Sequence, residues 1–179
     1  LAVRAWRGLP ALYLRAEQPE ASARADERLL ERRLADPVAV STRLARTYAQ
    51  LGRPEETQRT LRRLAEHAPK RLESDPELMW LDARAAEEQG KRAVAAGKLL
   101  RFANLHTRDP RRTEALVRAS GLYVELGREK LAIGLLREVI DSEPELNLAM
   151  DARLRLARLL CGSGRSDDAR DQVRTILDE

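Results

Sequence analysis

The chain has 179 residues, of which 43% are hydrophobic and 35% are charged, with a formal net charge of +4 and a pI near 9.6. This share of apolar residues excludes a disordered chain. Because the 29 acidic residues are scattered among the 33 basic ones without a basic block, no nucleic-acid partner is expected.

Alanine, leucine, arginine and glutamate dominate and only 3% of the residues are aromatic, a composition typical of helices packed on helices. The longest stretch without a charge, residues 8–14, is too short for a membrane helix, which needs about 20 apolar residues. We therefore expect no membrane insertion. The single cysteine, Cys161, excludes an internal disulfide and leaves the localisation unknown, with the cytoplasm and the bacterial periplasm both open.

The first predicted unit, residues 3–37, opens with the stretch WRGLPALY at residues 6–13. An interior proline is unfavourable in a helix, so Pro10 predicts either that the first helix begins at Leu9 or that it kinks there. In the second unit, residues 38–75, apolar residues recur at helical spacing before Gly52. This unit closes with KRLESD at residues 70–75, which predicts an extended linker or an extra turn.

Three more units are predicted at residues 76–112, 113–149 and 150–179. Asp75 precedes Pro76 and is expected to cap the helix that follows. Cys161 is expected to be a buried small hydrophobic residue. Second helices are expected to end at Asp36–Pro37, Ala68–Pro69, Asp109–Pro110 and Glu143–Pro144. The last two second helices are expected to bury Ala132, Leu135, Leu136, Val139 and Ile140, and then Ala169, Val173, Ile176 and Leu177.

Four glycines mark the repeat. Gly52, Gly90, Gly127 and Gly164 lie 38, 37 and 37 residues apart, and a basic residue follows each of them. A glycine ends a helix by adopting the left-handed conformation, and a nearby cation interacts favourably with the helix dipole. Each glycine therefore predicts a tight turn between two antiparallel helices.

The pattern resembles the tetratricopeptide repeat family, whose signature is W-x2-L-G-x2-Y, then A-x3-F, then P. Residues 6–13 match the first part with Pro10 in place of glycine, and Ala132-x3-Leu136 and Ala169-x3-Val173 match the second with aliphatic residues. The resemblance implies an all-α fold, a right-handed α-solenoid of about four to five hairpins. We expect one superhelical domain over residues 1–179, as a piece of a longer array.

Motifs for catalysis, phosphate binding or metal binding are missing from the sequence. We therefore expect no enzyme activity, no cofactor and no metal. A helical-repeat stack has instead a concave surface, which the first helices of the units line. With Val38, Pro76, Thr113 and Met150 as first positions, the expected groove residues are Thr42, Arg46, Gln50, Trp80, Arg84, Glu88, Val117, Glu125, Leu154 and Arg158.

Arg46, Arg84 and Arg158 occupy the same place in their units, where guanidinium groups suit an acidic partner segment. The alternative is that they pair with acids of their own or adjacent helices. Trp80 is either an anchor for a partner or a filler at a weak repeat contact. The family's two-carboxylate clamp has asparagine at the place of these arginines, so a receptor for chaperone C-termini is not expected.

We therefore predict a non-catalytic scaffold that binds a protein segment in its groove. Two alternatives remain open. The alanine- and arginine-rich units resemble bacterial periplasmic scaffolds of exopolysaccharide synthesis and secretion, which would make a polysaccharide the partner. The third hypothesis is a regulatory repeat module of a larger protein.

Overall fold

The computed structural model describes residues 2–142 and 146–178, which form helices and turns without a strand. The chain divides into two compact units, residues 1–91 and 92–179. The first unit contains α1 (Ala2–Arg15), α2 (Pro19–Glu31), α3 (Pro37–Gln50), α4 (Pro54–His67), α5 (Pro69–Ser74) and α6 (Pro76–Glu88). The second contains α7 (Arg92–Leu105), α8 (Arg112–Glu125), α9 (Glu129–Ser142), α10 (Leu146–Gly162) and α11 (Ser166–Asp178). None of the described helices is long and apolar enough to span a membrane.

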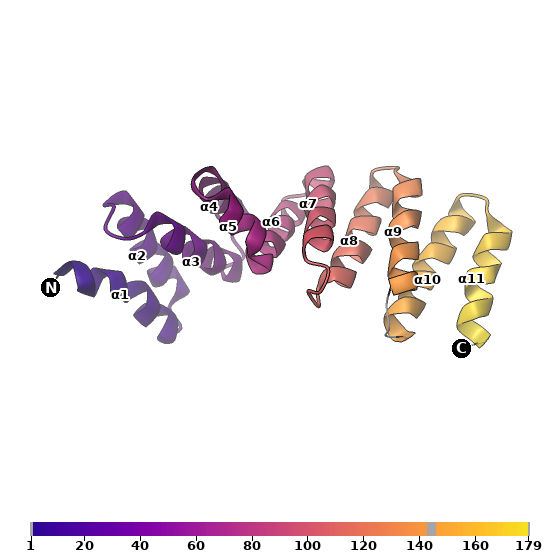
Figure 1. The fold of residues 1–179 in the computed structure, drawn as a ribbon, viewed down its shortest axis with the longest axis horizontal. Coiled ribbons are helices and arrows are strands. Elements are labelled where there is room, and N and C mark those ends of the chain that lie inside the picture. The colour runs from indigo at the N-terminus through magenta and orange to yellow at the C-terminus, as the bar shows by residue number, and fades with distance from the viewer. Residues whose placement is uncertain (1, 143–145, 179) are drawn as a thin grey trace. The chain divides into compact units, whose positions relative to one another are not determined.

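Within each unit, helices that follow one another along the chain pack against one another. In the first unit α1 packs on α2, α2 on α3 and α3 on α4, while α6 packs on both α3 and α4. In the second unit α7, α8, α9, α10 and α11 pack in the same consecutive manner, and Figure 1 shows them side by side. Within each unit the helices are therefore stacked in chain order.

The predicted glycine turns are confirmed. Gly52, Gly90, Gly127 and Gly164 have φ angles of +64°, +68°, +67° and +76°. At the second hairpin the Gly52 N–H donates to Ala49 O at 3.1 Å and the Arg53 N–H donates to Tyr48 O at 2.9 Å. This bond pair closes a helix in the Schellman motif. The same pair of backbone bonds recurs at Gly90, Gly127 and Gly164.

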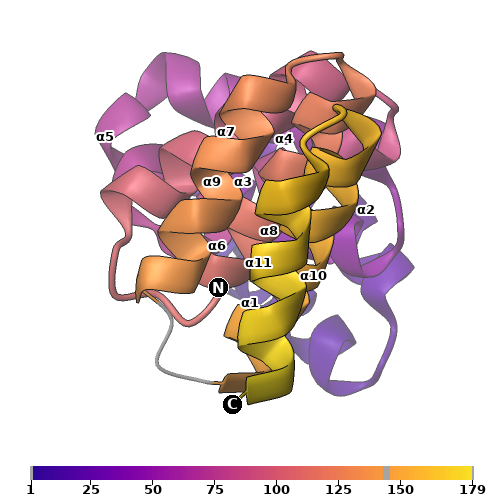
Figure 2. The same cartoon turned by 90° about the vertical axis from the view of Figure 1, so that its right-hand side faces the viewer.

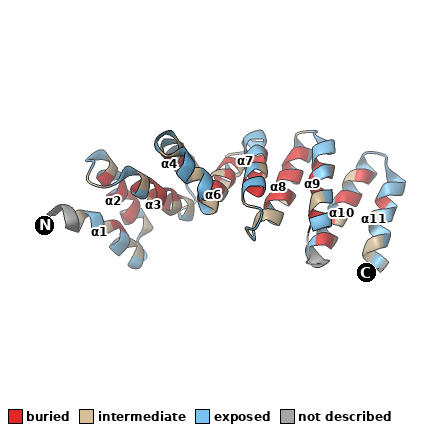
Figure 3. Cartoon of the chain, viewed as in Figure 1, coloured by how far each residue is buried: buried red, intermediate tan, exposed pale blue. Residues whose placement is uncertain are grey.

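Leucines and alanines from neighbouring helices form the cores. In the first unit Ala45 of α3, Leu61 and Leu64 of α4, and Leu78 of α6 form one buried cluster. In the second unit buried residues lie on α7, α8, α9 and α10 (Figure 3). The face predicted for α9 is confirmed at Ala132, Leu135, Leu136 and Val139, while Ile140 is half-buried.

Local capping also follows the sequence. Asp75 caps α6 as predicted, since its Oδ1 accepts hydrogen bonds from the N–H groups of Glu77 and Leu78 at 3.1 and 3.3 Å. Residues 70–75 form the extra turn rather than an extended linker, because Pro69 begins the short helix α5. The helix end at Ala68–Pro69 is confirmed, since α4 ends at His67, whereas α2 ends at Glu31 and so before the expected end at Asp36–Pro37. The expected end at Glu143–Pro144 lies outside the described residues.

Other expectations about the helices are wrong or only partly met. Of the two alternatives for Pro10, a helix start at Leu9 is wrong: α1 starts at Ala2 and contains Pro10, so the carbonyl of Trp6 lacks its usual intrahelical donor, and a kink there stays a prediction. The second helix expected to end at Asp109–Pro110 ends earlier, because α7 stops at Leu105 and turns lead from there to the start of α8 at Arg112. Cys161 is exposed rather than buried, since it lies on a side of α10 that no described helix covers.

The buried face predicted for α11 is only partly present. Ala169 is buried and Ile176 is half-buried, but Val173 is 40% exposed and Leu177 is 79% exposed. The reason is the absence of a further described helix on this side. Figure 2 shows α11, in yellow, as the helix of its unit nearest the viewer.

Candidate functional site

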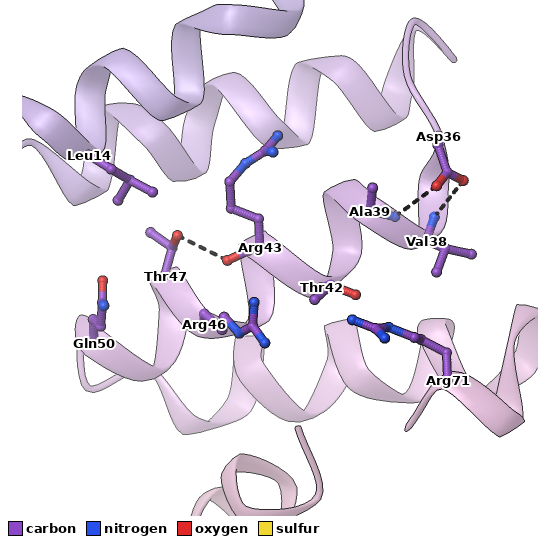
Figure 4. A pocket seen from close by; sticks show the side chains of 10 residues that line it. All are labelled: Leu14, Asp36, Val38, Ala39, Thr42, Arg43, Arg46, Thr47, Gln50 and Arg71. Atoms are coloured by element: carbon purple, nitrogen blue, oxygen red, sulfur yellow. Dashed lines mark hydrogen bonds between the residues drawn. The ribbon is translucent and has the colours of Figure 1, made fainter. Parts of the chain in front are cut away.

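A pocket of about 610 Å³ lies in the first unit. Residues of α1, α3 and α5 and the residue before α3 line it: Leu14, Asp36, Val38, Ala39, Thr42, Arg43, Arg46, Thr47, Gln50 and Arg71 (Figure 4). Thr42, Arg46 and Gln50, which the sequence predicted as groove residues of this repeat, therefore lie together in one pocket.

Helix α3 places these three residues. They are spaced by four, so their side chains lie along one face of the helix. The start of α3 is held by Asp36, whose carboxylate accepts hydrogen bonds from the N–H groups of Val38 and Ala39 at 3.1 and 3.2 Å. The helix that forms this wall of the pocket, α3, is therefore capped at its N-terminus.

Thr42 has an unused polar atom in this pocket. The residue is 6% exposed, and its hydroxyl has no hydrogen-bond partner among the described residues. The Nε of Arg46, one helical turn further on, is also buried without a partner in the described structure. An unpaired buried polar group costs about 1–3 kcal/mol, so these two donors favour a ligand that supplies acceptor oxygens.

The end of the Arg46 side chain is held by acids near the start of α6. Its Nη2 lies 3.3 Å from Asp75 Oδ2 and 2.7 Å from Glu77 Oε2. Arg71 of α5 approaches the same Asp75 oxygen at 3.2 Å. Figure 4 shows both guanidinium groups extending toward Thr42 from opposite sides. Asp75 thus orients two arginines while it caps α6.

Arg43 lines the same pocket but points toward α2, where it binds Asp26. The Asp26 side chain is fully buried. Burial raises the pKa of Asp26, while the hydrogen bond and the charge of Arg43 act in the opposite direction. Arg43 is therefore committed to packing α2 against α3.

The groove residues predicted on α6 do not line this pocket. Arg84 pairs within its own helix, with Glu88 at 3.2 Å and with Glu87 at 3.8 Å, and such half-exposed pairs contribute little to stability. Trp80 is half-buried and Glu88 is exposed. Their role in binding stays a prediction.

In the second unit, Glu125 and Arg158 line a groove of about 580 Å³ between α8 and α10. Glu125 is paired with Arg92 of α7, whereas Arg158 makes no hydrogen bond or ion pair with a described residue. Val117 is half-buried and does not line this groove, and Leu154 lines a different one on α10 and α11.

Reasoning from the sequence missed Leu14, Arg43 and Arg71 as pocket residues. Arg43 follows Thr42 directly but was outside the four-residue spacing used to select groove positions. Arg71 lies in the inserted turn, whose direction no repeat pattern specifies. The insertion between two repeat units was the signal that could have predicted Arg71, because an inserted turn adds side chains beside the face of a neighbouring helix.

Residues 40–71 match the family model described as Tetratricopeptide repeat. This range includes most of α3 and all of α4. Residues 40–71 are therefore similar to a tetratricopeptide repeat (TPR). The TPR match contains Thr42, Arg43, Arg46, Thr47, Gln50 and Arg71 of the pocket. No curated protein matched the chain.

Solved structures share the TPR fold over nearly the whole chain. A crystal structure of MamA is 19% identical, with 95% of this chain and 93% of that chain covered and a TM-score of 0.72. MamA 41-end from Desulfovibrio magneticus RS-1 is 13% identical, with 98% and 93% covered and a TM-score of 0.70. Kinesin light chain TPR-like repeats of Podosopora anserina are 19% identical, with 99% and 94% covered and a TM-score of 0.64. The expected fold class, an all-α solenoid of TPR-like hairpins, is confirmed.

Proposed function

We propose that this chain is a non-catalytic scaffold for protein–protein interaction, and that the pocket of the first unit holds a segment of the partner. The observation that carries the proposal is the buried, unpartnered hydroxyl of Thr42 in a pocket about 610 Å³ in volume. The TPR fold supports it, because stacked repeats present extended binding surfaces.

The chemistry of the pocket favours a partner segment with acceptor oxygens, and above all an acidic one. Thr42 Oγ1 and Arg46 Nε are the donors that lack partners, and the amide of Gln50 lies one turn further along the same helix. A carboxylate accepts two hydrogen bonds from such a donor pair, and bonds to a charged group are stronger than neutral ones. Glu77 binds Arg46 at present, so an incoming carboxylate replaces or joins that contact.

Binding of selected peptides tests the proposal. Linear peptides from a displayed random library are selected on the 179-residue chain, and their affinities are measured by fluorescence polarisation. Thr42→Val removes the hydroxyl at nearly constant shape and is expected to weaken pocket-binding peptides about five- to tenfold. Arg46→Leu is expected to weaken them further, with selected sequences enriched in aspartate and glutamate.

Arg28→Leu on the exposed side of α2 serves as the matched control, because it removes an arginine of the same unit outside the pocket. Its affinity for the peptides is expected to equal that of the wild type. If no selected peptide responds to Thr42→Val or Arg46→Leu, while both variants melt like the wild type, the pocket is not the binding site.

The hypothesis of an exopolysaccharide-secretion scaffold rests on composition alone, and no feature of the sequence supports that of a regulatory module. The contacts of the described residues add no support to either, and both stay predictions. The same is true of a bacterial periplasmic location.

A further inference from the structure

A second pocket of the first unit is lined by charged and amide side chains. Its volume is about 390 Å³, and it is formed by α4 and by the residues that follow α6. The residues that line it are Glu55, Gln58, Arg59, Arg62, Gln89 and Lys91. None of them lines the pocket of the proposed function, so the two pockets can be tested separately.

Gln89 joins the two sides of this pocket. Its Nε2 donates to the carbonyl of Ala85 in α6 and to the carbonyl of Pro54, the first residue of α4, at 2.9 Å each. Its Oε1 accepts a hydrogen bond from Lys91 Nζ. One side chain therefore connects the end of α6, the start of α4 and the ammonium group of Lys91. A pocket that is organised before its ligand arrives loses less entropy on binding.

No acid neutralises the cations of this pocket. Arg62 Nη2 and Lys91 Nζ donate to the same uncharged atom, Gln58 Oε1, at 2.9 and 2.8 Å. Arg59 makes no hydrogen bond or ion pair with any described residue. Glu55 lines the pocket too, yet within the described chain it forms an ion pair with none of the three cations. A charged acceptor would bind these cations more strongly than the amide oxygen does.

Gln58 also offers a donor. The residue is 3% exposed, and its Nε2 makes no hydrogen bond with another described residue. Arg62 uses one of the five N–H groups of a guanidinium in its bond with Gln58, and Lys91 uses two of the three of an ammonium group. Both cations therefore keep donors for a ligand while they stay bonded to Gln58.

These donors fit an anion that has several oxygens and more than one negative charge. Three cations and one carboxylate line the pocket, so two positive charges are left unbalanced. A phosphate group carries a charge of about −1.5 to −2 at pH 7 and three strong acceptor oxygens. A carboxylate has a single charge and two oxygens. The charge of the pocket and the number of its donors therefore favour phosphate.

We propose that this pocket binds a phosphate group, either as inorganic phosphate or on a phosphorylated side chain of a partner protein. Arg59, Arg62 and Lys91 bind its oxygens through charge-assisted hydrogen bonds, and the Gln58 amide donates to it. Glu55 opposes binding, because its charge has the same sign as that of the ligand.

An NMR titration of the ¹⁵N-labelled 179-residue chain tests the proposal. Inorganic phosphate is compared with acetate at the same ionic strength and at about pH 7.5, where phosphate is mainly a dianion. Phosphate is expected to shift the side-chain amide signals of Gln58 and Gln89 until they saturate. Acetate is expected to bind at least about tenfold more weakly.

Two peptide probes distinguish the sources of the phosphate. A tripeptide with a central phosphoserine is compared with the same tripeptide containing serine. Tighter binding of the phosphoserine tripeptide than of inorganic phosphate identifies a phosphorylated partner as the source, whereas equal or weaker binding identifies free phosphate. The serine tripeptide is expected not to bind in either case.

Removing two of the cations should weaken the site. Arg59→Gln/Lys91→Gln is expected to lower the affinity for phosphate at least about tenfold, because two charged donors are lost. The fold is expected to persist, since Arg59 has no partner in the described chain and Gln58 keeps its bond with Arg62. A melting temperature close to that of the wild type checks this point.

Matched variants separate the pocket from the overall charge of the chain. Arg28→Gln/Lys70→Gln removes one arginine and one lysine from exposed positions of the same unit outside the pocket, and is expected to bind phosphate like the wild type. Glu55→Gln is expected to raise the affinity for phosphate about threefold, because it removes a like charge. Glu66→Gln, at an exposed position of α4 outside the pocket, is expected to change nothing.

Equal binding of phosphate and acetate, or an affinity for phosphate that Arg59→Gln/Lys91→Gln leaves unchanged, overturns the proposal. Thr42→Val is expected to leave phosphate binding as it is in the wild type. Arg59→Gln/Lys91→Gln is likewise expected to leave unchanged the affinity of the peptides selected for the pocket beside α3. The failure of one site is therefore distinguishable from the failure of the other.

Discussion

Asp26 of α2 and Arg43 of α3 form a two-point ion pair in which Arg43 Nε donates to Asp26 Oδ2 at 2.9 Å and Arg43 Nη2 donates to Oδ1. The Asp26 side chain is fully buried, while that of Arg43 is 31% exposed. The pair links consecutive hairpins, because α2 and α3 belong to different repeat units. It also holds Arg43 at the edge of the candidate pocket.

Removing one partner of this pair should destabilise the first unit. Asp26→Ala is expected to lower the free energy of unfolding by about 3 kcal/mol, because a half-buried guanidinium loses its counter-charge and both of its bonds. Asp151→Ala is the control, since Asp151 pairs with Arg155 while both side chains are about half exposed. It is expected to cost less than about 1 kcal/mol in the same urea titration. Similar losses for the two variants would contradict the assignment of Asp26 as a buried structural acid.

Stability should depend on pH through Asp109. The side-chain hydrogen bond from Arg111 holds the pKa of Asp109 below its usual value of 3.8, although burial acts in the opposite direction. Because the pKa is lowered in the folded state, the stabilisation is complete above about pH 4 and disappears as the pH falls through the folded-state pKa. The difference in unfolding free energy between the wild type and Asp109→Asn is therefore expected to shrink with acidification, in urea titrations from about pH 6 to pH 2. A difference that stays constant over this range would show that Asp109 does not contribute through its charge.

Replacing glycine by alanine should change the stability of the chain in opposite directions at two positions. Gly127 has a φ of +67°, which costs a residue with a Cβ about 1 kcal/mol, so Gly127→Ala is expected to lower the melting temperature. Gly134 lies inside α9, and a Cβ there would meet nothing within 4 Å. Gly134→Ala is expected to stabilise the chain by roughly 0.5–1 kcal/mol, because alanine is the better helix former. Thermal melts followed by circular dichroism distinguish the two signs, and a Gly127→Ala variant that melts like the wild type would show that the turn tolerates a side chain.

Equivalent positions in consecutive repeats should differ in their cost of truncation. Leu136 is 2% exposed under α10, and Leu136→Ala is expected to cost about 2–5 kcal/mol through loss of contacts and cavity formation. Val173, its equivalent on α11, is 40% exposed, and Val173→Ala is expected to cost less than about 1 kcal/mol. Equal costs in urea denaturation of the isolated chain would mean that the α11 face is already covered in solution.

Much of the fold could be read from local patterns. Glycines with positive φ end the helices before Gly52, Gly90, Gly127 and Gly164, and Asp75 with Pro76 begins α6, as expected from residue type alone. Turn and cap conformations are decided by a few neighbouring residues, so the sequence predicts them without knowledge of the partners. Pro10 marks the limit of such local rules, because α1 continues past it and does not begin at Leu9.

The candidate site was less predictable. The four-residue spacing correctly grouped Thr42, Arg46 and Gln50 on one face of α3. It carried no information about Arg71, because the path of the inserted helix α5 depends on its packing against α4 and α6. The spacing also did not predict whether Arg46 and Arg84 pair with acids of their own chain. In the structure Arg46 pairs with Asp75 and Glu77, and Arg84 pairs with Glu88.

The sequence by itself determined the glycine turns, the cap of α6 and the apolar side of most helices, because these properties follow from turn and capping residues and from a period of 3.6 residues. Only the tertiary structure decided which apolar faces are covered. The same repeat position is buried at Leu136 and open at Val173, and Thr42 is buried with a hydroxyl that nothing in the described chain satisfies. Burial depends on the neighbouring helix rather than on the residue itself, and this neighbour decides whether an apolar face becomes core or a binding surface.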